Sequence, residues 1–138
     1  MIQSFTAINW LGVLAAFVPY CMLGALWFTA LFKKQYLTSL GKENAPEQKP
    51  APIFIVGPMI CCLVITLATA LLVYALGISS YASAIELAFV IGIGFLAANT
   101  VNIAINPNIP RPLLYGLISG TYHLIGILIV CVILFAMK

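Results

Sequence analysis

The chain has 138 residues, of which 64% are hydrophobic and only 7% are charged, and its net charge is +3. Soluble globular proteins carry about 25% charged residues, so this composition excludes a water-soluble fold and makes the lipid bilayer the expected partner. The few basic residues lie beside apolar segments, a pattern that does not indicate nucleic-acid binding. The length fits a single domain that spans residues 1–138.

The charged residues are concentrated in one short segment. Six of the nine lie between Lys33 and Lys49. No Lys, Arg, Asp or Glu occurs in the ranges 1–32, 50–85, 87–110 and 112–137. Because roughly 20 apolar residues cross a bilayer core, each range can span the membrane once. The sequence therefore predicts an all-α integral membrane protein, a four-helix transmembrane bundle. The predicted spans are 8–32, 53–76, 84–105 and 113–137, and the only sizeable loop is 33–52.

The first span is flanked by aromatic and basic residues. Trp10 and Trp27 lie near its two ends, where amphipathic rings settle at the membrane interface, so both are predicted interface anchors. Lys33 and Lys34 follow directly and are candidate contacts for anionic lipid head groups. The beginning of the loop, residues 33–40, can extend the first helix into the head-group region.

The third span carries small and polar residues at helical spacing. Steps of three and four residues place one row on a single helix face: Ala88, Gly92, Phe95, Asn99, Asn102 and Asn106. Ala88 and Gly92 are predicted to pack closely against another helix. Asn99 and Asn102 are predicted to face the interior of the bundle, because amides in lipid need hydrogen-bond partners.

The fourth span holds the strongest candidate site. Gly116 and Gly120 form a small-xxx-small pattern that predicts helix packing. His123, the only histidine, lies about 16 Å into the span at 1.5 Å per residue, near the bilayer midplane. An ionisable residue at this depth is a functional hypothesis by default. Together with Tyr122, Asn99 and Asn102, it forms the predicted ligand-binding row.

Three roles for His123 remain open at this point. It can bond neighbouring helices, contact a ligand or ion, or join a metal or haem site. One histidine without a second ligand makes a poor metal site, so no metal or cofactor is predicted. The four cysteines all lie in apolar spans without metal or disulfide spacing, and we expect them to act as small hydrophobes. No nucleophile–base pair or carboxylate pair predicts a catalytic set.

The distribution of basic residues predicts the orientation. The loops after the first and third spans share one side and hold five of the six basic residues: Lys33, Lys34, Lys42, Lys49 and Arg111. The other side has only Lys138. The positive-inside rule therefore places these loops in the cytoplasm and both termini outside the cell membrane. Arg111 is the predicted anchor of the third loop at the cytoplasmic surface.

Three segments carry a resemblance to a known family. Asn9–Leu11 begins the first span, Gly24–Phe28 ends it, and Gly120–Leu124 lies in the fourth span. They resemble segments of the DUF1761 family of small membrane proteins. The resemblance implies a four-helix integral membrane protein of uncharacterised function, and it implies no activity, substrate or cofactor.

Three classes of function fit these observations. The first is a homo-oligomer that binds or translocates a small solute or ion through the polar row of the third and fourth spans. The second is a structural or accessory membrane protein in which the same polar residues only bond helices together. The third is a membrane redox or lipid-modifying subunit, for which the sequence shows no catalytic residues.

Overall fold

The protein is a bundle of four long helices, seen in a computed structural model that describes residues 2–46 and 50–138. Within these residues all regular structure is helical, which confirms the predicted fold class. Each of the four helices is long and apolar enough to cross a bilayer. Lys49, one of the predicted loop cations, lies outside the described residues.

Each span begins and ends within three residues of its predicted bounds. The first span consists of α2 (Trp10–Leu26) and the π-helix η1 (Trp27–Leu31), and the second is α4 (Ile53–Ala75). The third span consists of α5 (Tyr81–Phe89), the π-helix η2 (Val90–Ala97) and α6 (Ala98–Ala104). The fourth is α7 (Pro112–Ala136), and two short helices, α1 (Ile2–Ala7) and α3 (Lys33–Ser39), lie outside the spans.

Local sequence signals explain several helix ends. The Asn9 side chain caps α2 by accepting hydrogen bonds from the backbone N–H groups of Leu11 and Gly12. Ser80 caps α5 in the same way through the N–H of Ser83. After α4, Gly77 adopts a φ of +63°, a left-handed conformation that favours glycine and ends the helix.

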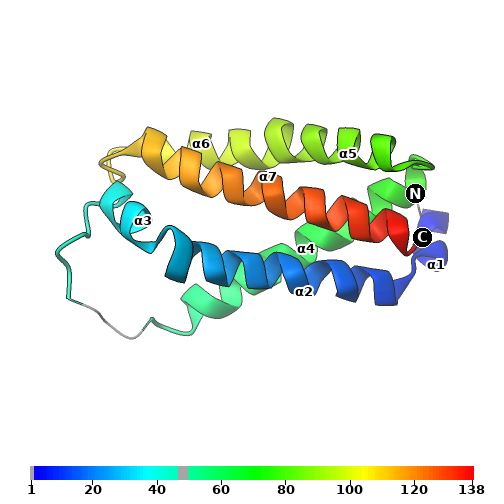
Figure 1. Cartoon of the computed structure of the whole chain (residues 1–138), viewed down its shortest axis with the longest axis horizontal. Helices are drawn as coiled ribbons and strands as arrows, with labels where there is room; N and C mark the ends of the chain where they lie inside the picture. Colours follow the sequence, from blue (N-terminus) through cyan, green and yellow to red (C-terminus); the bar gives the residue numbers. More distant parts are fainter. Residues whose placement is uncertain (1, 47–49) are drawn as a thin grey trace.

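The last helix, α7, occupies the centre of the bundle. It packs against α2, α4 and all three parts of the third span. Half of the residues in its most apolar stretch are buried, against 22–28% in the other three spans. Figure 1 shows α7 running between α2 and the third span, with both chain ends at one end of the bundle and α3 at the other.

Helix α3 is a separate element and does not simply extend the first span. Phe32 leaves the helical conformation, with φ −123° and ψ 18°. After this break α3 packs beside α7, and the Arg111 N–H donates to the Ser39 carbonyl at 3.2 Å. The Arg111 guanidinium lies 3.8 Å from Glu43, and both side chains are well exposed, so this ion pair adds little stability.

The π-helix η2 changes which residues of the third span face α7. Up to the first turn of η2, Ala84, Ala88 and Gly92 are buried. After it, Val101 and Ala104 face inward, whereas an unbroken α-helix would have put Asn99 and Asn102 there. The prediction that these two asparagines face the bundle interior is therefore wrong. A π-helix has more residues per turn than an α-helix, and it rotates everything that follows.

Candidate functional site

A cluster of polar and aromatic side chains joins the first and fourth spans near the middle of the bundle. The Tyr20 hydroxyl lies 2.9 Å from Nδ1 of His123, a hydrogen bond between residues 103 positions apart. The Tyr20 ring stacks on Tyr122 with centroids 5.5 Å apart. Tyr122 and His123 were predicted from the sequence, and the structure adds Tyr20 as their partner.

Two glycines make room for the tyrosines. A Cβ atom at Gly126 would collide with the Tyr20 ring, which lies directly against the α7 backbone. A Cβ at Gly24 would lie 2.9 Å from the Tyr122 hydroxyl. The aromatic rings can therefore fill the space between α2 and α7 only because both positions lack a side chain.

Trp27 is part of this cluster, contrary to its predicted place at the membrane interface. It is only 8% exposed, and its indole Nε1–H donates to the Ile118 carbonyl at 3.0 Å. The bond braces the end of the first span against α7. Trp10, in contrast, is 55% exposed at the opposite end of the span, as an interface residue would be.

Two cysteines extend the cluster toward the second span. The Cys62 thiol lies 3.3 Å from the Tyr122 hydroxyl, and Cys21 lies within interaction range of Cys62. Sequence spacing gave no sign of this contact, because the residues come from three different spans. The cluster is therefore contiguous: Cys62 bonds to Tyr122, the Tyr122 ring stacks on Tyr20, and Tyr20 bonds to His123.

Two polar atoms on one face of α7 have no partner among the described residues. Ser119 is 4% exposed, and its buried Oγ makes no hydrogen bond. His123 is one turn further along, and its Nε2 makes no hydrogen bond with any described residue. Positions four apart lie on the same helix face. Buried polar atoms are nearly always paired, so the unpaired Ser119 hydroxyl is unusual, whereas His123 is only half-buried.

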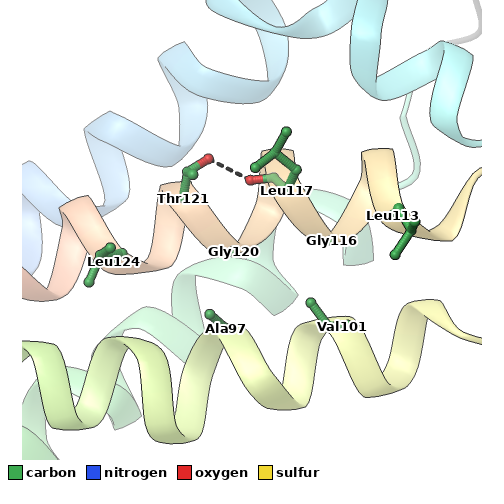
Figure 2. A pocket seen from close by; sticks show the side chains of 8 residues that line it. All are labelled: Ala97, Val101, Leu113, Gly116, Leu117, Gly120, Thr121 and Leu124. Atoms are coloured by element: carbon green, nitrogen blue, oxygen red, sulfur yellow. Dashed lines mark hydrogen bonds between the residues drawn. The ribbon is translucent and has the colours of Figure 1, made fainter.

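The small residues predicted for helix packing lie between the third span and α7. Gly92 adjoins Leu124. Gly116 and Gly120 face Val101 and Ala97, as Figure 2 shows. Ala88 is fully buried on the same side of the third span. These residues allow the two backbones to approach closely within one chain.

A shallow groove of about 340 Å³ opens beside this contact, but it is not the polar site. Its lining consists of Ala97, Val101, Leu113, Gly116, Leu117, Gly120, Thr121 and Leu124. The one side-chain hydroxyl here, that of Thr121, donates to the Leu117 carbonyl at 2.6 Å (Figure 2). The groove therefore presents almost entirely apolar surface.

The structure does not bring Asn99 and Asn102 into the cluster. Both are exposed, and neither side chain makes a hydrogen bond with a described residue. The described residues also contain no group of three or more His, Cys, Asp or Glu that could hold a metal ion.

Comparison with known protein families identifies the family of this chain. The family described as a protein of unknown function, DUF1761, matches residues 11–135. The chain belongs to this family. In this DUF1761 protein the match covers the whole cluster, from Tyr20 to His123. No curated protein and no solved structure matches the chain.

Proposed function

We propose that this cell-membrane protein binds a small uncharged polar solute at Ser119 and His123. The observation that carries the proposal is the buried, unpartnered hydroxyl of Ser119 one turn from the free Nε2 of His123. Leaving a polar atom buried without a partner costs about 1–3 kcal/mol, so a ligand that pairs with it recovers that energy.

The hydrogen bond from Tyr20 sets the chemistry of the site. When the Tyr20 hydroxyl donates to Nδ1, the imidazole proton lies on Nε2, which then acts as a donor. Ser119 can donate or accept. A hydroxyl or carbonyl oxygen on a small solute satisfies both groups. A cation would favour carboxylate ligands, and the described residues contain no group of three or more His, Cys, Asp or Glu that could hold a metal ion.

The single histidine makes the proposal directly testable. With ¹⁵N-labelled histidine and no affinity tag containing histidine, every imidazole signal of the protein in nanodiscs reports His123. We expect glycerol or urea at molar concentration to shift the Nε2 resonance of the wild type and not of Ser119→Ala. Tyr20→Phe should change the ratio of the two tautomers.

The matched control is Thr121→Ala, which removes a hydroxyl from the same helix outside the cluster. Its spectrum and solute response should equal those of the wild type. The proposal would be contradicted if the wild-type Nε2 resonance with small alcohols or amides present were the same as in water alone. Uptake of the same solutes into proteoliposomes then tests whether binding leads to translocation.

A structural role is the second candidate, and one observation favours it. The 2.9 Å bond between Tyr20 and His123 ties the first span to the last without any ligand. In that case Tyr20→Phe and His123→Ala destabilise the bundle, and Ser119→Ala changes no spectroscopic response to solute.

We also propose the finer features of membrane placement. Lys33 and Lys34 are exposed directly after the first span, a position that supports contact with anionic head groups of the cytoplasmic leaflet. The excess of basic residues on the same side supports extracytoplasmic termini. We further propose that the protein is a homo-oligomer, because the four spans of one chain enclose little space through which a solute could pass.

A further inference from the structure

The outward face of the third span carries two amides without partners. The side chains of Asn99 and Asn102 are exposed and make no hydrogen bond with any described residue. Neighbouring polar side chains differ in this respect: Thr100 donates to the Leu96 carbonyl at 2.7 Å, and Asn106 donates to the Ile103 carbonyl at 2.6 Å.

The depth of Asn99 makes its exposure unfavourable in a single copy. It lies five residues before the end of α6 at Ala104, about 8 Å inside the span at 1.5 Å per residue. Lipid tails cannot hydrogen-bond, so an amide at this depth needs a protein partner. Asn102 lies closer to the helix end and can reach the head groups.

The surface around Asn99 is apolar and exposed. Phe95 and Ile103, one turn before and one turn after Asn99 on the same helix face, are 66% and 59% exposed. These apolar side chains give a second helix a surface to pack against, and the amide can then bond across the contact.

We propose that a second copy of this chain packs on the face formed by Phe95, Asn99 and Ile103. A two-fold axis along the membrane normal would place Asn99 beside Asn99 of the second copy at the same depth. The carboxamide has both donor and acceptor atoms, so the two side chains exchange a pair of hydrogen bonds. This self-complementarity selects a second copy over a lipid or an unrelated helix.

This surface differs from the Gly116 and Gly120 motif considered in the sequence. Those glycines pack against Val101 and Ala97 within one chain, on the opposite side of the third span. The inference deepens the proposed homo-oligomer without depending on the solute site. Asn99→Leu should leave the solute response of His123 intact, and Ser119→Ala should leave association intact, so the two proposals can fail separately.

The test measures association in phosphatidylcholine vesicles. We expect energy transfer between donor- and acceptor-labelled chains to rise with protein density as for a dimer. Asn99→Leu should weaken association roughly ten-fold, and Asn99→Gln, which keeps the amide, should retain most of it. Leu117→Ala, which shortens an exposed side chain in the groove between α7 and the third span, is the control and should change nothing.

A second measurement locates the contact. Asn99→Cys should form an intermolecular disulfide on mild oxidation with copper phenanthroline in the vesicles, and Leu117→Cys should not. The proposal is overturned if the wild type stays monomeric at all densities, if Asn99→Leu associates as the wild type does, or if cross-linking is stronger at Leu117. Dependence of association on an unrelated membrane protein would also overturn it.

Discussion

At the residue scale, the hydroxyl side chains of the buried spans behave in two ways. Thr66 and Thr69 donate to the carbonyl one turn earlier, at 2.8 Å in both cases, so burial leaves them satisfied. Ser119 makes no such bond although it is equally buried. Removing the Ser119 hydroxyl should therefore stabilise the protein when no ligand is bound.

We expect Ser119→Ala to stabilise the ligand-free bundle by about 1 kcal/mol, because it removes an unpaired buried hydroxyl and installs a better helix former. The free energy of unfolding, measured by SDS titration in mixed micelles, checks this. Thr66→Ala is the matched control. It removes a satisfied hydroxyl and should not be stabilising. A loss of stability in Ser119→Ala would show that the hydroxyl has a structural partner.

The glycines under the tyrosine pair give a second prediction. Gly126→Ala places a methyl group against the Tyr20 ring and should destabilise the protein by about 1–3 kcal/mol. Gly57→Ala in α4 is the control, because its new methyl group would meet only Ile53, at an ordinary 3.8 Å. Equal stabilities of the two variants would contradict the tight contact between Tyr20 and α7.

At the scale of the element, η2 is the point where the third span accommodates one extra residue. The inward positions are 84, 88 and 92 up to the first turn of η2, and 97, 101 and 104 from its last residue onward. These two sets do not fit one α-helical repeat. Shortening the segment by one residue would bring them into register at steps of three and four. The π-helix thus keeps both halves of the span packed on α7.

Deletion of Gly94 should therefore be tolerated, with a change in the free energy of unfolding within about 1 kcal/mol, because the π-turn becomes a regular α-turn. Deletion of Ile125 in α7 is the control. That helix has no π-segment, so half of its buried face would rotate away from its neighbours. Helicity and thermal unfolding in detergent measure both variants, and a Gly94 deletion that unfolds as readily as the control would contradict this interpretation.

The same segment marks the limit of what the sequence could predict. The lengths of the uncharged segments predicted the four spans. The depth of His123 in the fourth span identified it as a candidate site residue. The prediction that Asn99 faces the interior assumed a regular α-helix across residues 90–97. That segment is a π-helix, so the prediction fails. Tyr20 and Cys62 could not be found either, since their partners lie on other spans and no local spacing encodes contacts between helices.

At the scale of the whole molecule, the two ends of the bundle differ in charge and in construction. The end with the chain termini is held by hydrogen bonds from the Asn9 side chain to the Met137 carbonyl and from Lys138 to the Ile78 carbonyl, both 2.8 Å. The opposite end carries α3 and most of the basic residues. The positive-inside rule assigns the latter end to the cytoplasm.

A reporter pair tests this orientation. Alkaline phosphatase fused after Lys138 should be active, and green fluorescent protein fused there should stay dark, because the proposed topology places this end of α7 outside the cytoplasm. A green fluorescent protein fusion truncated after Lys42 should fluoresce and serves as the control. Strong fluorescence from the fusion at Lys138 would reverse the assigned topology.

The central position of α7 has a consequence for how the protein is made. The spans are synthesised in chain order, and α7 follows the other three. The first three spans lack much of their common packing surface until α7 arrives, since the first and third each pack extensively on it. The bundle therefore completes its packing only after α7 has been synthesised, when the Met137 carbonyl can accept the hydrogen bond from Asn9 and join the end of α7 to the first span.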